Sequence, residues 1–374
     1  MTTASTTLGS PRRGGRVRRR SAGRRRQFNR YSLCLAAVVA LLGCATAGLN
    51  SLVDPLWFGA GNRLTGQNYI FNERIAKLNL LLQDPQGYDC LIFGSSRLTL
   101  LDQTQVSGHR CANLSFAAGK VRDFIAYARY LADHGLQPRL VIVGVDDFNF
   151  LELPNEAVNV PDFVRDRTPP PGLLHSYFSL TALDFSQRTL RRESPEPRYY
   201  DDRFVGRVLA GTPPYTPPAT LTEIDIKSPY DPERMALYRE LRETFPEVRF
   251  WGFVPPVSPW KVAERRYLGG VLDGYFEAME KTAGLFEVFY DFSVPSETTG
   301  NRANTYDGSH YLPEIYTVVV ERLLAAQKMA PADSFGLPVH AMSPAHYRRA
   351  FNAGLDRFLT AEFPELAKIR AASR

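Results

Sequence analysis

Five short apolar runs divide the middle of the chain, and amphipathic segments separate them. The runs are rich in β-branched and aromatic residues, which is typical of strands buried on both faces. They lie at residues 88–94, 111–117, 139–145, 247–254 and 285–292. Helical spacing of apolar residues is found at 121–134, 232–244, 261–283 and 312–329. This alternation predicts an α/β fold, with a doubly wound, mainly five-stranded parallel sheet that carries helices on both faces.

Two segments fall outside the alternation. Residues 151–228 contain repeated proline clusters, which predict an insertion that lies over the sheet with little regular structure. Residues 331–374 form a C-terminal extension, in which the pattern at 346–363 predicts an amphipathic helix. The α/β domain itself is expected to cover residues 54–330.

The N-terminal part differs from the rest in charge. Residues 1–30 hold ten arginines and no acidic residue, and without them the chain's net charge of +6 becomes −4. Residues 31–53 then carry no charge over 23 residues, about the length that crosses a hydrocarbon layer as a helix. The basic segment is therefore interpreted as a disordered cytoplasmic tail and not as a nucleic-acid arm.

We interpret residues 31–53 as an uncleaved transmembrane signal anchor that leaves the following domain in the periplasm of a bacterium, on the outside of the cytoplasmic (inner) membrane. Three alternatives stay open. Residues 40–44 resemble a lipoprotein cleavage box, residues 45–47 offer a small-x-small cleavage site, and residues 24–30 resemble a twin-arginine signal. Each of them gives the same compartment.

Cysteine placement is compatible with export. Cys34 and Cys44 lie in the apolar segment, which leaves Cys90 and Cys111 as the pair in the exported part. Two thiols that open neighbouring strands in an oxidising compartment could form a disulfide. They could equally be two small buried side chains.

A glycine, two serines and an arginine end the first strand, at residues 94–97. In a doubly wound fold, ligands bind at the carboxyl ends of the strands. Free N–H groups at such a turn favour developing negative charge. Serine is also a common helix cap, so the position alone does not make either side chain a nucleophile.

His310 is the histidine best placed to activate a serine. It follows the fifth strand and precedes the last long helix of the domain, with Asp307 three residues before it. This spacing lets a carboxylate orient an imidazole, as a general base requires. A capping aspartate beside a surface histidine, or a metal-dependent hydrolase that uses both side chains, would have the same spacing.

In these blocks the chain resembles the SGNH/GDSL hydrolase superfamily over residues 85–325. It is most similar to the membrane-anchored envelope members that transfer acyl groups to polysaccharides or D-alanine to teichoic acids. The resemblance implies an SGNH-like, flavodoxin-like sheet. It places Ser96 as the nucleophile, His310 as the base and Asp307 as the acid that orients it.

The blocks that form the oxyanion hole match less well. Ser115 stands at the position of the family's glycine, and Gly119 comes later. In the third block Gly144 is retained, but Asp146 replaces an asparagine whose amide would donate a hydrogen bond. An ionised carboxylate cannot donate, and losing one such donor costs about 3 kcal/mol of transition-state stabilisation. Asp146 could be turned into the structure, leaving backbone donors and Arg97; it could bind an acceptor hydroxyl; or the site could be disabled.

The resemblance implies a serine esterase or O-acyltransferase that acts on a cell-envelope glycan or exopolysaccharide through an acyl-serine. A multispanning membrane protein could supply the acyl group. Trp260 follows the fourth strand and could stack on a sugar or belong to the core. A catalytically inactive module that binds glycan or scaffolds an export complex remains the alternative.

The sequence lacks the motifs of several other enzyme classes. No Gly-x-Gly-x-x-Gly follows the first strand, the Gly-Lys pair at residues 119–120 lacks a phosphate-binding loop, and no His-Glu-x-x-His occurs. A nucleotide enzyme or a zinc enzyme is therefore not expected, and no cofactor is predicted.

Overall fold

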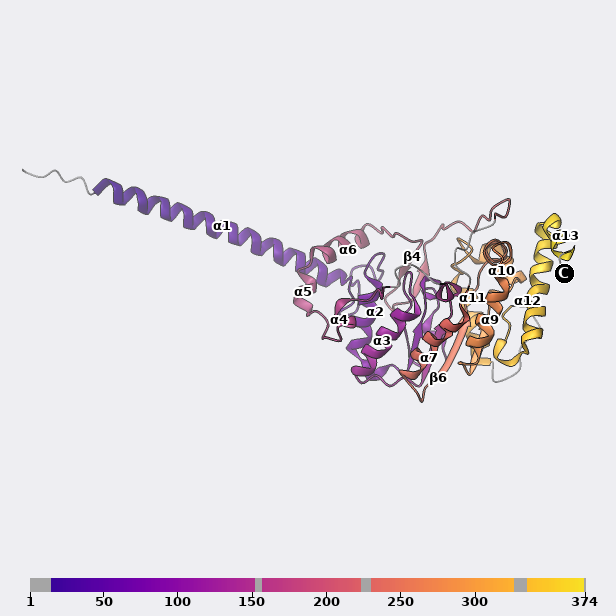
Figure 1. The fold of residues 1–374 in the computed structure, drawn as a ribbon. Helices are drawn as coiled ribbons and strands as arrows, with labels where there is room; N and C mark the ends of the chain where they lie inside the picture. Colours follow the sequence, from indigo (N-terminus) through magenta and orange to yellow (C-terminus); the bar gives the residue numbers. More distant parts are fainter. Residues whose placement is uncertain (1–14, 152–156, 223–229, 326–334, 373–374) are drawn as a thin grey trace, which may run out of the picture.

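Five parallel strands form one central sheet within residues 15–151, 157–222, 230–325 and 335–372, which the computed structural model describes (Figure 1). The strands are β1 (Cys90–Phe93), β2 (Cys111–Asn113), β3 (Leu140–Gly144), β6 (Arg249–Val254) and β7 (Val288–Asp291). Their spatial order is β2-β1-β3-β6-β7. This is the order of a doubly wound sheet, in which the connections reverse direction between β1 and β3. The predicted strands are confirmed.

Both faces of the sheet are buried, because successive side chains point to opposite sides. Leu91 and Phe93 belong to one apolar cluster, whereas Cys90 and Ile92 belong to the other. The first cluster is covered by α2 (Glu73–Gln83), α3 (Val121–Asp133), α7 (Met235–Glu243), α9 (Leu272–Ala283) and α12 (Pro344–Glu362). The second is covered by α11 (Pro313–Ala325). The predicted layers are therefore confirmed.

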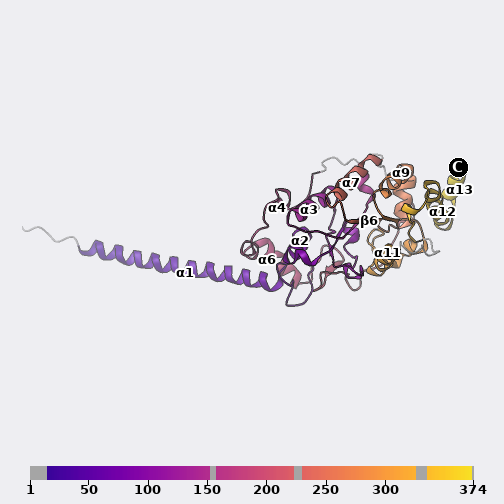
Figure 2. The ribbon, with the colours of Figure 1, turned by 90° about the horizontal axis from the view of Figure 1, so that it is seen from below.

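Helix α1 (Gly15–Val53) projects from one end of the domain, far from the C-terminal helices (Figures 1 and 2). Its part from Gln27 to Val53 is long and apolar enough to cross a membrane. The helix begins within the basic segment, so the prediction of a disordered tail is wrong from Gly15 onward. Residues 1–14 lie outside the described part of the chain.

The proline-rich insertion holds more regular structure than its composition predicts. Its helices are α4 (Asp162–Arg165), α5 (Leu173–Tyr177) and α6 (Leu180–Leu190), and its hairpin pairs β4 (Arg198–Tyr200) with β5 (Gly206–Val208). The prolines in the described part of the insertion lie between these elements or at their ends, where they interrupt no helix. The hairpin packs on the sheet domain closely enough that a Cβ at Gly206 would clash with the Thr99 carbonyl.

The long helix expected at 261–283 is broken. It starts as α8 (Pro259–Val262), continues as a π-helical turn (Ala263–Leu268), and resumes as α9 after Gly270, which has φ +68°. Such a backbone angle ends the helix, and glycine adopts it without strain. The remaining helices are α10 (Glu297–Gly300), the predicted C-terminal helix α12, and α13 (Pro364–Ala372).

Candidate active site

Ser96 opens a short 3-10 turn (Ser96–Leu98) at the carboxyl end of β1, next to the point where the sheet connections reverse. The two serines of this turn have different environments. Ser95 is buried, and its Oγ caps the turn by accepting a hydrogen bond from the Arg97 N–H at 3.3 Å. Ser96 is only partly buried. The cap is therefore Ser95, and Ser96 is the hydroxyl that faces outward.

Leu98 holds the turn against the sheet. It is fully buried, and a Cβ at either Gly94 or Gly144 would lie 2.6 Å from one of its methyl carbons. Both glycines are thus required for close packing around this side chain. The turn that carries Ser96 is fixed by this packing at the ends of β1 and β3.

Asp307 and His310 come from a single tight loop before α11. Asp307 Oδ1 accepts hydrogen bonds from the Ser309 and His310 N–H groups, both at 2.8 Å. Thr305 Oγ1 accepts from the Gly308 N–H at 2.9 Å and donates to the His310 carbonyl at 2.8 Å. These bonds orient the loop so that the carboxylate and the imidazole meet.

The loop and the serine turn converge above the sheet. His310 Nδ1 lies 2.7 Å from Asp307 Oδ2, and His310 Nε2 lies 2.9 Å from Ser96 Oγ. The carboxylate favours the tautomer in which Nδ1–H donates to Asp307, which leaves Nε2 to accept the serine proton. All three side chains are partly exposed. The structure thus brings together the three residues that the sequence predicted.

The electrostatics of the loop keep Asp307 charged. Burial would raise its pKa, but the hydrogen bonds from the His310 ring and from the His310 and Ser309 backbone lower the pKa below its usual range. Tyr306 stacks flat on the His310 ring, with centroids 5.4 Å apart. The imidazole is therefore held by a charged partner at one nitrogen and by an aromatic face.

The two loop residues expected at the oxyanion hole use their N–H groups elsewhere. Ser115 is fully buried, and its N–H donates to Asn113 Oδ1 at 3.0 Å. The Gly119 N–H donates to the Phe116 carbonyl at 3.0 Å. Both N–H groups are therefore already engaged by acceptors of the protein. The N–H of Ser96 stands at the first position of its turn, where it has no acceptor within the turn.

Asp146 lies beneath the serine turn and is fully buried. Its Oδ1 accepts from Arg97 Nη1 at 2.9 Å, and the same guanidinium nitrogen lies 3.6 Å from Asp147 Oδ1. Burial raises the pKa of Asp146, and Arg97 opposes that shift. Asp147 in turn pairs with Arg266 at 3.2 Å. Of the three explanations for Asp146, this placement matches the one in which it is turned into the structure.

Other side chains near the site were not singled out from the sequence. Lys261 Nζ donates to Ser309 Oγ at 3.0 Å, and burial lowers the pKa of this lysine. Arg198 comes from the insertion hairpin, and its charge acts on the Tyr306 hydroxyl. Only their contacts across distant elements reveal them. Trp260 is 4% exposed and packs on Phe358, so it belongs to the core and is not available to stack on a sugar.

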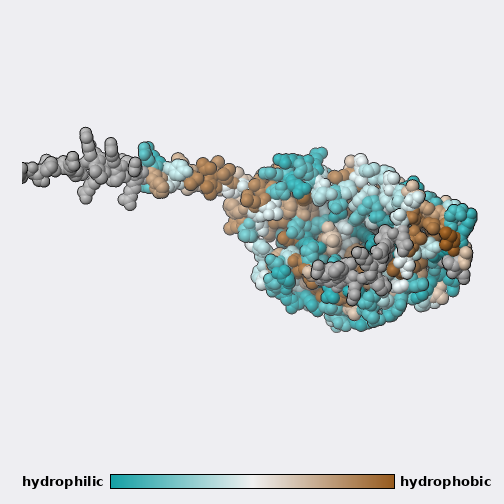
Figure 3. Space-filling view, turned by 45° about the horizontal axis from the view of Figure 1, so that its top comes forward, coloured by the Kyte–Doolittle hydropathy of each residue, from teal (hydrophilic) through white to brown (hydrophobic). Residues whose placement is uncertain are grey.

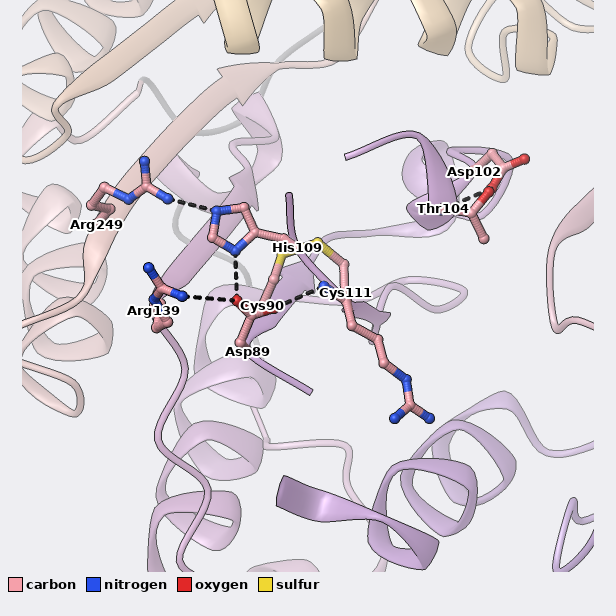
Figure 4. Close-up of a disulfide and its surroundings, with 9 residues drawn as sticks. Asp89, Cys90, Asp102, Thr104, His109, Cys111, Arg139 and Arg249 are labelled. Atoms are coloured by element: carbon pink, nitrogen blue, oxygen red, sulfur yellow. Dashed lines mark hydrogen bonds and ion pairs between the residues drawn. A yellow bond between two sulfur atoms is a disulfide. The ribbon is translucent and has the colours of Figure 1, made fainter. Parts of the chain in front are cut away.

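A second histidine and aspartate pair lies at the opposite edge of the sheet, beside the disulfide (Figure 4). Cys90 and Cys111 form a disulfide, which confirms the first of the two alternatives for this pair. His109 Nδ1 contacts Asp89 Oδ2 at 2.9 Å, but its Nε2 faces Arg249 Nη2 at 2.6 Å. With an arginine where a nucleophile would be, this pair is a structural ion cluster.

No family model matches the chain, and no similar curated protein was found. The relation to SGNH hydrolases therefore remains a hypothesis that rests on the residues and their geometry.

Proposed function

We propose that the protein is a serine esterase or O-acyltransferase of the SGNH type, anchored in the membrane by α1, which acts on an envelope glycan through an acyl-serine. The observation that carries this proposal is the continuous contact from Asp307 through His310 to Ser96. Its two distances, 2.7 and 2.9 Å, lie within the range for proton transfer in such an arrangement.

The first step forms a bond between Ser96 Oγ and the ester carbonyl carbon as His310 Nε2 takes the hydroxyl proton. The tetrahedral intermediate then collapses, and His310 returns the proton to the departing alcohol. Water or a sugar hydroxyl attacks the acyl-serine in the second step, with the same imidazole as base. Asp307 stabilises the imidazolium that forms in each step.

Negative charge on the carbonyl oxygen needs donors that the third block does not supply. The Ser96 N–H at the start of the 3-10 turn is the nearest candidate, since such groups have no partner within the turn. Lys261, which contacts the residue before His310, adds positive charge at the same edge. We assign the oxyanion site to these groups and not to Asp146.

The candidate site for a glycan is a cleft of about 380 Å³ whose lining does not include Ser96, Asp307 or His310. It is lined by aromatic and charged side chains, among them Tyr69, Phe116 and Arg198. Arg198 belongs to this lining, and its charge acts on the Tyr306 hydroxyl. Since Tyr306 stacks on His310, Arg198 and Tyr306 link the lining of the cleft to the base. Aromatic faces with a few directed donors are typical of sugar sites.

Turnover of acetyl esters tests the proposal. The full chain in detergent is expected to hydrolyse p-nitrophenyl acetate, and Ser96→Ala and His310→Ala should each abolish the turnover. His109→Ala is the matched control, because it removes the other paired histidine, which lies at the opposite edge of the sheet. Turnover that survives Ser96→Ala, or is lost equally in His109→Ala, would contradict the assignment.

A non-catalytic glycan-binding module is the other outcome. In that case the full chain would bind a polysaccharide, but it would neither hydrolyse esters nor react with a serine-directed reagent. The acetylated glycan itself should then be tested as both donor and acceptor, because a transferase that needs its own donor is silent on simple esters.

A further inference from the structure

The last turns of α1 are locked to the insertion by one amide. Asn50 is fully buried; its Nδ2 donates to the Tyr177 carbonyl at 2.7 Å and to the Ser179 carbonyl at 3.2 Å. Its Oδ1 accepts from Ser186 Oγ at 2.9 Å. The three partners belong to α5, α6 and the link between them. A buried amide whose bonds cross an interface fixes the direction in which α1 leaves the domain.

The same two helices and the link between them expose large apolar side chains at the end of the domain from which α1 emerges. Leu174 is 70% exposed, Leu180 is 76% exposed and Phe178 is 52% exposed. The Phe178 ring lies against the helix, 3.4 Å from where a Cβ on Gly43 would be. Figure 3 shows hydrophobic surface along α1 that continues onto the end of the domain from which the helix emerges.

The position of this contact along α1 sets its depth in a membrane. An α-helix rises about 1.5 Å per residue, so crossing about 30 Å of hydrocarbon from Tyr31, just after Arg30, ends near Asn50. Gly43 then lies about 10 Å inside the outer boundary. Phe178 contacts α1 at that level, so the link between α5 and α6 cannot remain in water while α1 spans the membrane.

We infer that α5, α6 and the link between them form a membrane-embedded collar beside α1, in which Leu174, Phe178 and Leu180 contact the acyl chains of the outer leaflet. The collar is continuous with the apolar surface of the spanning helix, which identifies lipid as its occupant. Moving apolar side chains of short helices from water into the bilayer at this depth lowers the free energy. This inference requires α1 to span the membrane, but it does not depend on the proposed chemistry.

Tryptophan substitution in the full chain tests the collar. Leu174→Trp and Leu180→Trp are each placed in nanodiscs of phosphatidylcholine, with or without bromine on the acyl chains. The signal of the parent protein, which contains three native tryptophans, is subtracted. The added emission should be blue-shifted and mostly lost in brominated lipid. Ile369→Trp is the matched control, since Ile369 is 63% exposed on α13 at the other end of the domain and should show neither effect.

Two results would overturn the inference. Emission from positions 174 and 180 that matches the Ile369→Trp control would place the helices in water. Blue-shifted emission that brominated lipid leaves unquenched would show that protein, such as a second copy or another membrane protein, covers them. Ester turnover is measured on the same samples, so failure of the collar can be told from failure of the active site.

Discussion

His310 Nε2 lies 2.9 Å from Ser96 Oγ, although 214 residues separate the two positions in the chain. The contact forms because the turn after β1 and the loop before α11 meet at the carboxyl edge of one sheet. Side chains that meet there and are partly exposed can reach a ligand. The chemistry proposed for the protein follows from this single contact and from the carboxylate behind it.

Asp307→Asn is expected to reduce ester turnover by about 10⁴-fold, because the amide no longer stabilises the imidazolium and can favour the wrong tautomer. The measurement is kcat for p-nitrophenyl acetate at neutral pH. Asp89→Asn removes the carboxylate of the other histidine pair and should leave kcat unchanged. Similar losses in both variants would mean that the effect is structural.

The pH dependence of stability should change in the same variant. Because the folded-state pKa of Asp307 is below its ordinary value of 3.8, the carboxylate contributes stability that is complete above that value. The contribution is lost as the pH falls through the folded-state pKa. Urea unfolding of the parent and of Asp307→Asn should therefore differ more at neutral pH than in acid. A difference that stays constant or grows on acidification would contradict the assigned shift.

Asp146→Asn distinguishes a structural role from a catalytic one. The substitution keeps the shape but removes the charge that faces Arg97, so we expect a loss of about 2 kcal/mol in the free energy of unfolding. Turnover should not rise, since the side chain lies beneath the turn. Higher turnover would show that the amide reaches the oxyanion and that the site resembles the family pattern more closely.

The disulfide should stabilise the first two strands. Cys90 and Cys111 are 21 residues apart, and a loop of that size contributes about 3 kcal/mol in the chain-entropy model. The double substitution to alanine should lower the free energy of unfolding by that amount and make stability insensitive to reductant. Substituting Cys34 and Cys44, which are free and exposed, is the control and should change neither property.

The sequence predicted the sheet well because parallel strands buried on both faces read as unbroken apolar runs. It predicted the insertion less well, because proline clusters reveal where helices stop but not that α5 and α6 form between them. The break at Gly270 within the helix expected at 261–283 was also missed, although the two adjacent glycines at 269–270 are a local signal against a continuous helix.

The residues of the candidate site were also predicted only in part. Ser96, Asp307 and His310 were identified from local motifs and from their order in the chain. The burial of Asp146, and the use of the Ser115 N–H by Asn113, depend on how separate loops pack against each other. Arg198 and Lys261 reach the site from the insertion and from α8, so no local pattern marks them.

The most direct test of the central claim is the site at which a serine-directed fluorophosphonate reacts. After labelling of the full chain, peptide mass spectrometry should find the reagent on Ser96 and not on Ser95, and His310→Ala should suppress the reaction. If Ser96 stays unmodified in the folded protein, or if labelling persists without His310, the acyl-serine mechanism is contradicted.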